Sequence, residues 1–276
     1  MSKVHPVKVG DFFEIDQSRF YLIGGPCSIE NEDMAFEVAE TVKKICDTLN
    51  ICYVFKGSFD KANRSSLNAG RAVGIDKGLD ILAEIRRSLH VPVTTDVHET
   101  WQCEQVGEVV DILQIPAYLC RQTDLLIAAA KTGKTVSVKK GQFMAPQNMD
   151  NVIEKIVSTG NNNCILMERG SSFGYNKLVV DMTGLPIMRE LGYPVFIDAT
   201  HSVQEPGGSK TFTKGNRKFA ETIMYAALGA GVDGVFAEIH PDPDNAISDV
   251  GSQLKLSEIE PILRKAVLID RVAKGE

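Results

Sequence analysis

Six cationic side chains stand directly after, or close behind, short apolar runs of the sequence. They are Lys56, Lys61, Arg64, Lys139, Lys140 and Arg169. Cations that share one place repel each other, so a cluster of them in a chain with a formal net charge of −6 needs bound anions. Arginine offers phosphate a planar pair of donors, and lysine offers it a point charge. If the fold gathers these side chains, they predict a pocket for more than one phosphate group.

A second set of four side chains has the chemistry of a metal site. The set, which comprises a thiol, an imidazole and two carboxylates, is Cys27, His201, Glu238 and Asp249. Such mixed ligands suit Zn²⁺, Fe²⁺ or Mn²⁺ and leave a position for water or substrate. The residue types alone leave alternatives open. Cys27 is equally expected as a buried thiol, His201 as a hydrogen-bonded base, and His98 or His240 as a rival ligand.

Both sets need a fold that brings their positions together. Eight short runs rich in Val and Ile recur along the chain, each too short for a helix, as is typical of parallel strands covered on both faces. These runs are residues 20–25, 53–56, 93–96, 112–115, 135–138, 164–168, 195–198 and 235–238. Segments with apolar residues at helical spacing separate them, and the clearest cover residues 33–49, 77–89, 124–131, 148–157, 217–230 and 256–269.

Eight strands that alternate with helices over 276 residues predict an α/β fold, a closed (β/α)8 TIM barrel. The alternative is an open doubly wound sheet, but its glycine fingerprint is missing because Gly24-Gly25-Pro26 is not GxGxxG. Residues 7–9 and 12–15 flank a Gly-Asp turn, which predicts a hairpin within residues 1–17 that caps the bottom of the barrel. We expect one domain over residues 1–276.

Composition and charge argue against several classes of protein. Hydrophobic residues make up 43% of the chain and charged residues 24%, which argues against disorder. The acidic balance gives no reason to bind nucleic acid or an anionic membrane. No apolar run is long enough for a signal peptide or a membrane span, so we expect a cytoplasmic protein. The six cysteines form no CxxC pair and are expected to be free thiols.

In a TIM barrel the active site lies at the carboxyl ends of the strands. The cations and the metal candidates all follow predicted strands, as does Asp96 after the third strand. The first, seventh and eighth strands are near neighbours in a closed barrel, so Cys27, His201 and Glu238 can converge there. His201 and Asp96 are candidates for moving protons.

Several stretches at these strand ends form a recognisable pattern. The most specific is Phe59-Asp60-Lys61-Ala62-Asn63-Arg64-Ser65-Ser66. The others are Arg121-Gln122-Thr123-Asp124, Lys139-Lys140-Gly141-Gln142-Phe143, Glu168-Arg169-Gly170 with Phe173-Gly174-Tyr175, Ala199-Thr200-His201-Ser202 and His240-Pro241-Asp242-Pro243. Together they span nearly the whole chain after the predicted hairpin, and they resemble the 3-deoxy-D-manno-octulosonate 8-phosphate synthase family.

The resemblance implies an enzyme, typically a homotetramer, that condenses phosphoenolpyruvate with arabinose 5-phosphate to make a sugar of lipopolysaccharide. Family members that need no metal have Asn where this chain has Cys27, and Ser248-Asp249 with Gln253-Leu254 also resembles the metal-dependent class. The resemblance therefore implies a divalent metal, such as Zn, Fe or Mn. Its ligands would be Cys27, His201, Glu238 and Asp249.

The same resemblance implies roles for the substrate-binding positions. Phosphoenolpyruvate would be held by Lys56, Lys61, Lys139, Gln142 and Arg169. Arabinose 5-phosphate would be held by Asn63, Arg64, Ser65, Asp96 and Gln204, and its phosphate would be reached by Arg121 of a neighbouring subunit. Further candidates for substrate contact are Ser58, Pro116 and Ala117. The candidate catalytic residues are His201, Asp96 and Lys139.

Three other functions are weighed against this one. The related heptulosonate 7-phosphate synthase uses erythrose 4-phosphate, and the segment Asn63-Arg64-Ser65-Ser66 argues against it. A Schiff-base aldolase would use one lysine such as Lys139, would be trapped by borohydride and would ignore chelators. A non-catalytic phosphosugar-binding protein would bind metal and phosphoenolpyruvate without releasing phosphate.

Overall fold

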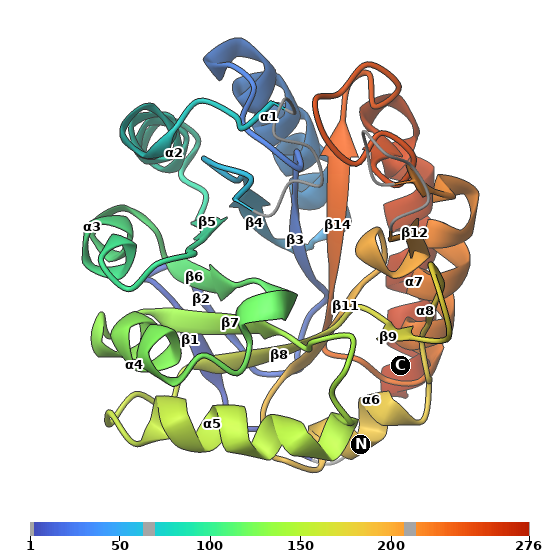
Figure 1. Cartoon of the computed structure of the whole chain (residues 1–276). Coiled ribbons are helices and arrows are strands. Elements are labelled where there is room, and N and C mark those ends of the chain that lie inside the picture. The colour runs from blue at the N-terminus through green and yellow to red at the C-terminus, as the bar shows by residue number, and fades with distance from the viewer. Residues whose placement is uncertain (1–2, 63–69, 207–213, 276) are drawn as a thin grey trace.

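Eight parallel strands form a closed ring at the centre of the molecule (Figure 1). The computed structural model describes residues 3–62, 70–206 and 214–275. The ring strands are β3 (Tyr21–Gly25), β4 (Cys52–Lys56), β5 (Val93–Asp96), β6 (Ile112–Ile115), β7 (Thr135–Lys139), β8 (Cys164–Glu168), β11 (Val195–Asp198) and β14 (Gly234–His240). Neighbours in this order pair in parallel, and β14 closes the ring by pairing with both β11 and β3. The predicted TIM barrel is therefore confirmed, and the open sheet is excluded.

Both faces of the ring strands are buried, which explains why the strands are continuous apolar runs in the sequence. Side chains that point into the ring, among them Ile23, Ile165 and Phe196, form an inner core. Alternate side chains such as Leu22 and Leu166 belong to a larger outer core beneath the helices. The predicted strand limits lie within two residues of the observed ones.

In the described part of the chain, eight α-helices surround the ring (Figure 1). They are α1 (Glu32–Leu49), α2 (Ile75–Leu89), α3 (Gln102–Val109), α4 (Thr123–Lys131), α5 (Asp150–Val157), α6 (Gly184–Arg189), α7 (Ala220–Gly229) and α8 (Ile259–Lys274). The sequence did not predict α3 and α6, because α6 has only six residues and the mostly polar sequence of α3 shows no clear apolar stripe.

Short elements complete the loops between the ring strands and the helices. The 3-10 helices are η1 (Ala117–Leu119), η2 (Pro146–Met149), η3 (His201–Val203), η4 (Arg217–Phe219) and η5 (Leu256–Glu258). The minor strands are β9 (Ser171–Ser172), β10 (Leu178–Val179), β12 (Gln204–Glu205), β13 (Lys214–Gly215) and β15 (Leu254–Lys255). Most of these elements lie after a ring strand, so the loops at the carboxyl end of the ring are the more elaborate ones.

The N-terminal hairpin covers the amino end of the ring. Its strands β1 (Val7–Val9) and β2 (Phe13–Ile15) pair in antiparallel fashion, and their buried apolar side chains belong to the inner core. The backbone N–H of Lys8 donates to Asn163 Oδ1 (3.2 Å), and Thr135 Oγ1 donates to the Lys8 carbonyl. Both partners lie where ring strands begin, so the hairpin is placed as predicted and leaves the carboxyl end open.

All six cysteines are buried free thiols, as the sequence predicted. Five of them are packing residues of the two cores: Cys46, Cys52, Cys103, Cys120 and Cys164. Cys27 belongs to neither core and follows the carboxyl end of β3. It is therefore the cysteine whose position suggests chemistry.

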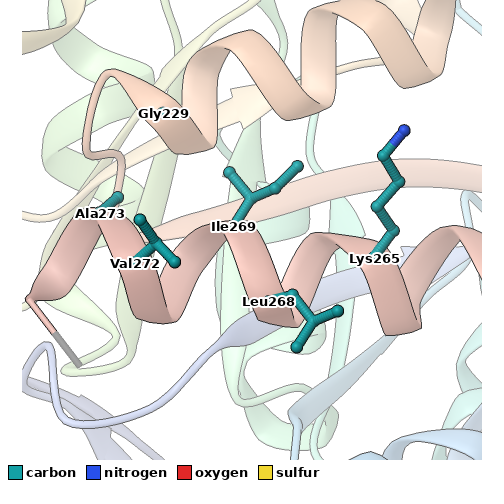
Figure 2. A pocket seen from close by; sticks show the side chains of 6 residues that line it. All are labelled: Gly229, Lys265, Leu268, Ile269, Val272 and Ala273. Atoms are coloured by element: carbon teal, nitrogen blue, oxygen red, sulfur yellow. The ribbon is translucent and has the colours of Figure 1, made fainter.

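The outer surface of the helical layer carries a shallow apolar groove of about 340 Å³ (Figure 2). Residues of α8 line most of it, opposite the end of α7, and the full set is Gly229, Lys265, Leu268, Ile269, Val272 and Ala273. None of these residues follows a ring strand, so the groove is separate from the carboxyl end of the ring. In the ranges that the structure describes, no helix is both long enough and apolar enough to cross a membrane.

The substitution Gly234→Ala is expected to destabilise the barrel. An added Cβ would lie within 3.0 Å of the ring of Phe196 in the inner core, and overpacking of this kind costs about 1–3 kcal/mol. Gly229→Ala is the control, because nothing lies within 4 Å of its added Cβ and alanine is favoured over glycine in a helix by about 0.5–1 kcal/mol. Denaturant unfolding followed by circular dichroism measures both. Equal stability of the two variants would contradict a close-packed inner core.

Candidate active site

The predicted catalytic residue Lys139 is fixed at the carboxyl end of the ring by a buried ion pair. Lys139 ends β7, and its ammonium pairs with the carboxylate of Asp198, which ends β11. The same nitrogen lies 3.8 Å from the ring centre of Phe236 and 3.2 Å from Nδ1 of His201. Burial lowers the pKa of Lys139, although Asp198 opposes that shift. Burial also disfavours the Asp198 anion, but His201 and Lys139 hold its pKa below the ordinary value.

Asp198 also sets the orientation of His201. One carboxylate oxygen of Asp198 lies 2.7 Å from His201 Nδ1, and the other accepts the backbone N–H of His201 at 2.9 Å. This contact favours a proton on Nδ1 and leaves the Nε2 lone pair available to a cation. Nε2 lies 3.4 Å from Oε1 of Glu238 and 3.7 Å from Oδ2 of Asp249. His201 therefore faces two further carboxylates with its free nitrogen.

Three of the four side chains of the predicted metal site, Cys27, Glu238 and Asp249, converge, and His201 lies beside two of them. Cys27 Sγ lies 3.0 Å from Asp249 Oδ2, and ligand atoms of Cys27, Glu238 and Asp249 all lie within 4.8 Å of one another. Ligands about 2.0–2.3 Å from a tetrahedral Zn²⁺ are roughly 3.5 Å apart, so these separations suit a metal. Oε2 of Glu238 is buried and has no hydrogen-bond partner among the described residues. With His201 Nε2 beside them, these donors fit a divalent cation.

The charges of this group also favour a cation. Burial raises the pKa of the Cys27 thiol well above its ordinary value, and Asp249 and Glu238 raise it further. Burial likewise opposes the charge of Glu238, but His201 and Lys56 lower its pKa to about 2. A divalent cation would favour the thiolate form of Cys27 and pair with the carboxylates of Glu238 and Asp249. It would thereby offset the electrostatic repulsion between these acidic groups.

The two rival histidines lie outside the group. His240 Nε2 is 3.3 Å from Oε1 of Glu30, and His98 Nε2 is 2.9 Å from Oδ2 of Asp96. Each of these nitrogens therefore faces a carboxylate other than those of Glu238 and Asp249. The geometry favours His201 as the imidazole of the predicted metal site.

A second polar group lies beyond the ends of β4 and β5. Ser58 Oγ donates to Oδ1 of Asp96 and accepts a hydrogen bond from Lys61 Nζ at 2.9 Å. Burial opposes the charge of Asp96, but Lys61 and His98 hold its pKa well below the ordinary value. Asp96 is thus a buried carboxylate beside a cation, and it can accept hydrogen bonds from hydroxyl groups of a ligand.

Lys56 lies next to the predicted metal ligands. Its side chain is only 1% exposed, and its ammonium donates to the Cys27 carbonyl at 2.9 Å. The ammonium also lies 3.3 Å from Oε1 of Glu238. Lys56 therefore fixes the Cys27 segment and balances Glu238, and its predicted contact with phosphoenolpyruvate stays a prediction.

Two buried side chains carry unused polar atoms. Nη2 of Arg169 donates to Gln204 Oε1 at 2.7 Å, whereas Nη1 has no partner within the described ranges. Gln204 in turn donates to Oδ1 of Asp249 at 2.9 Å. Oε1 of Gln142 is also unpartnered among the residues that the structure describes. Because buried polar groups are normally hydrogen-bonded, each of these two atoms is a candidate contact for a polar ligand.

Lys140 does not face this site. The expectation that it belongs to the cluster of six cations is therefore wrong. It follows Lys139 directly and points to the opposite side of the strand, where it is completely buried. Its ammonium donates to the Met144 carbonyl (3.1 Å) and Ser171 Oγ (3.0 Å) and lies 3.4 Å from Oε2 of Glu168. Lys140 therefore ties the loop after β7 to the loop after β8.

The remaining predicted substrate residues lie at the rim or outside the described ranges. Pro116 and Ala117 directly follow β6. Arg121 is exposed shortly before α4, and its carbonyl accepts a hydrogen bond from Lys155 at 3.1 Å. Three predicted residues fall outside the described part of the chain: Asn63, Arg64 and Ser65.

Two residues with clear places in this site received no role from the sequence. Asp198 contacts both Lys139 and His201, and its position at a strand end three residues before His201 was the available signal. Gln253 accepts the backbone N–H of Cys27 at 2.9 Å across 226 positions of the chain. No spacing rule could have found that contact, because only the closed ring brings the two segments together.

Comparison with known proteins agrees with this arrangement. A family model described as the DAHP synthetase I family matches residues 6–270. The 2-dehydro-3-deoxyphosphooctonate aldolase of Fusobacterium nucleatum subsp. nucleatum is 52% identical over 275 residues, which are 100% of this chain and 99% of that protein. The protein of the same name from Chelativorans sp. is 52% identical over 270 residues, 98% of each chain. The one from Desulfotalea psychrophila is 55% identical over 248 residues, 90% of this chain and 89% of the relative.

The name shared by these relatives is another name for 3-deoxy-D-manno-octulosonate 8-phosphate synthase, the family that the sequence motifs resemble. The match covers the ring strands together with the loops that carry the site. This chain belongs to the DAHP synthetase I family, among its 2-dehydro-3-deoxyphosphooctonate aldolases.

Proposed function

We propose that this chain condenses phosphoenolpyruvate with D-arabinose 5-phosphate and water. The products are 3-deoxy-D-manno-octulosonate 8-phosphate, a precursor of lipopolysaccharide, and phosphate. The shared name of the full-length relatives supports this reaction. The structural observation that carries it is the group formed by Cys27, Glu238 and Asp249, with His201 Nε2 beside it, which suits a divalent cation. Lys139 and the unused donor of Arg169 lie at the ends of neighbouring ring strands.

The cations suit phosphoenolpyruvate, whose carboxylate and phosphate are both anionic. Its proposed partners are Lys56, Lys61, Lys139, Gln142 and Arg169. Arg169 Nη1 offers an unused donor in a buried setting, where a charge-assisted hydrogen bond is strong. Lys139 is already held by Asp198 and Phe236, so little reorganisation is needed when the substrate arrives.

The polar group around Asp96 suits the hydroxyl groups of the sugar. Asp96, Ser58 and Gln204 are proposed to hold arabinose 5-phosphate, together with residues 63–65. Pro116 and Ala117 are proposed to line the same pocket from the end of β6. Fixing the aldehyde carbon next to C3 of phosphoenolpyruvate supplies much of the rate, because the enol carbon is a weak nucleophile.

The bond changes follow from this placement. C3 of phosphoenolpyruvate bonds to the aldehyde carbon, and the aldehyde oxygen takes a proton. Water adds at C2, which creates a tetrahedral carbon that still carries the phosphate, and phosphate then leaves by C–O cleavage. Lys139 and Arg169 stabilise the negative charge that gathers there.

Proton transfer is proposed for Lys139 rather than for Nε2 of His201. Nε2 is the atom that would bind a cation, so it cannot carry a proton in the same state. Burial lowers the pKa of Lys139, which makes its ammonium a better acid, and that ammonium lies beside His201. Burial opposes the charge of Asp96, but Lys61 and His98 hold its pKa well below the ordinary value, so this carboxylate is a weak base and is proposed to accept a hydrogen bond from a hydroxyl group of the sugar.

Cys27, His201, Glu238 and Asp249 are proposed to hold a divalent metal such as Zn, Fe or Mn. When bound, such an ion supplies positive charge that can polarise a carbonyl or orient a water molecule. The chain's own part is to hold Cys27, Glu238 and Asp249 at suitable separations, while Asp198 fixes the His201 ring beside Glu238 and Asp249.

Three further proposals concern the protein as a whole. We propose a homotetramer in which Arg121 of one chain completes the sugar-phosphate site of a neighbour, and its exposure at the rim before α4 supports that role. We also propose one domain over residues 1–276 and a cytoplasmic location. These two follow from the sequence pattern and from the resemblance.

Phosphate release from phosphoenolpyruvate is expected to be at least about tenfold faster with arabinose 5-phosphate than with erythrose 4-phosphate. The shorter sugar lacks one carbon with its hydroxyl group, so the polar site loses a hydrogen bond to the substrate, and a hydrogen bond lost at a buried polar group costs about 1–3 kcal/mol. A phosphate-release assay with each sugar, and with none, measures this. A preference for erythrose 4-phosphate would assign the chain to heptulosonate synthesis. No release with either sugar, in the presence of metal, would support a binding protein instead.

Removing the metal is expected to abolish activity, and added Mn²⁺, Zn²⁺ or Fe²⁺ is expected to restore it. Cys27→Ala should lose the metal and keep the fold, whereas Cys164→Ala, a thiol of the outer core, should keep the metal. Elemental analysis and circular dichroism follow both variants. A metal-free native enzyme that turns over at full rate and is trapped by borohydride would point to a Schiff base on a lysine such as Lys139.

Cys27→Asn separates two uses of the metal. Asparagine can hydrogen-bond to a water molecule near the vacated position but cannot supply a thiolate. Residual turnover in this variant with no metal present would mean that the metal mainly orients groups. A folded variant without any turnover would mean that the charge of the metal is essential.

Arg121→Ala is expected to raise KM for arabinose 5-phosphate about tenfold or more and to leave KM for phosphoenolpyruvate nearly unchanged. The reason is the loss of one charge-assisted contact to phosphate, worth roughly 1.5–3 kcal/mol. Mixed oligomers of Arg121→Ala and Lys139→Ala chains should regain part of the activity, because some sites then have both side chains intact. No recovery in mixed oligomers verified by mass spectrometry would contradict a shared site.

A further inference from the structure

The proposed metal ligands come from loops that are far apart in the sequence. Cys27 lies between β3 and α1, and Asp249 lies between β14 and β15, yet Cys27 Sγ and Asp249 Oδ2 are 3.0 Å apart. Neither loop belongs to the ring itself. The separation of the two donors therefore depends on what fastens one loop to the other.

The side-chain amide of Gln253 fastens the two loops. This side chain is 1% exposed. Its Oε1 accepts the backbone N–H of Cys27 at 2.9 Å, and its Nε2 donates to the carbonyl of Ser248 at 2.9 Å. The amide of Gln253 is thus hydrogen-bonded both to the backbone of Cys27 and to the carbonyl of Ser248, the residue before Asp249.

The backbone around Gln253 holds this amide in place. The N–H groups of Ser252 and Gln253 both bond to the carbonyl of Asp249, at 3.0 and 3.3 Å, and close a turn. Asp249 has a φ of 50°, in the left-handed region, so it adopts a conformation that needs such support. Oγ of Ser28 and Oγ of Ser248 are 3.0 Å apart and form a second link between the loops.

We propose that Gln253 is a positioning residue that preorganises the metal site by clamping the Cys27 loop to the Asp249 loop. It contributes no ligand atom to the proposed metal site and is not among the proposed substrate contacts. Without the clamp, metal binding itself would have to order the two loops, and that ordering would weaken the affinity. Partners of this kind, which hold the ligands of a metal, typically change affinity by about 10–100-fold. This inference rests on the proposed metal site and extends it to a residue that binds no metal.

Gln253→Leu tests the clamp, because it keeps a side chain of similar size and removes both hydrogen bonds. The affinity of the metal-free chain for Zn²⁺ is measured by competition with a chromophoric chelator. We expect Gln253→Leu to bind Zn²⁺ about 10–100-fold more weakly than the native chain. If this variant does not fold, Gln253→Asn, whose side chain is too short to span both loops, provides the same measurement.

Asn161→Leu is the matched control. Asn161 is also a buried amide, and it donates to the carbonyls of Ala130 (3.0 Å) and Lys134 (2.8 Å) near the amino end of the ring. Its Oδ1 also accepts the backbone N–H of Asn163 at 2.9 Å, so its replacement removes hydrogen bonds to three backbone groups, and the Tm should fall in both variants. The Zn²⁺ affinity of Asn161→Leu should stay within about twofold of native, because its amide lies away from both loops.

The outcomes separate this inference from the proposed metal site. Native affinity in Gln253→Leu, or an equal loss in Asn161→Leu, would overturn the clamp. A native chain that binds no Zn²⁺ would instead overturn the metal site on which the clamp rests. Weakened binding in Gln253→Leu alone would support the clamp, because a purely structural role would not discriminate between the two buried amides.

Discussion

The buried ionisable groups at the carboxyl end of the barrel can stay charged only because each has an opposite charge beside it. Lys139 pairs with Asp198, Lys56 lies against Glu238, and Lys61 lies close to Asp96. Removing one member of such a pair leaves the other buried and uncompensated, which costs several kcal/mol. The ring strands and loops must therefore place each buried charge beside an opposite one, and charged substrates must meet the same requirement when they bind.

The closed ring meets the constraint through the order of its strands. β3, β14 and β11 are neighbours, so acids that lie far apart in the sequence meet on one side of the mouth. β7 and β8 deliver Lys139 and Arg169 close by. Below them the inner core fills the ring with apolar side chains, and the hairpin covers its amino end. Water and substrates therefore have one end of the ring at which to approach the charged groups.

The positions of the reactive groups depend on residues that need touch no substrate. Asp198 orients His201 and pairs with Lys139, Gln253 joins the Cys27 segment to Ser248, and Lys140 links two loops from behind the strand. Such residues have well-defined partners in the structure, but the sequence pattern does not reveal those partners. The positions of the few reactive side chains are therefore set by a larger number of buried polar contacts around them.

Sequence alone determined the fold and most of the residue types in the site. Strands covered on both faces show up as short continuous apolar runs, and reactive side chains at their ends indicate the active end of a TIM barrel. Motifs such as 59–66 and 139–143 pointed to the family that the full-length relatives share. Short helices such as α6 escaped this approach, because one or two turns carry too little periodic signal.

Tertiary structure alone decided which candidates act together. Lys139 and Lys140 are neighbours in the sequence, but the alternation of side chains along a strand sends one to the mouth and the other into the outer layer. His201 was separated from His98 and His240 by the carboxylates that each ring faces. The role of Gln253 arises from a contact across 226 positions. Local patterns report burial and periodicity, whereas the pairing of distant charged and polar groups exists only once the ring has closed.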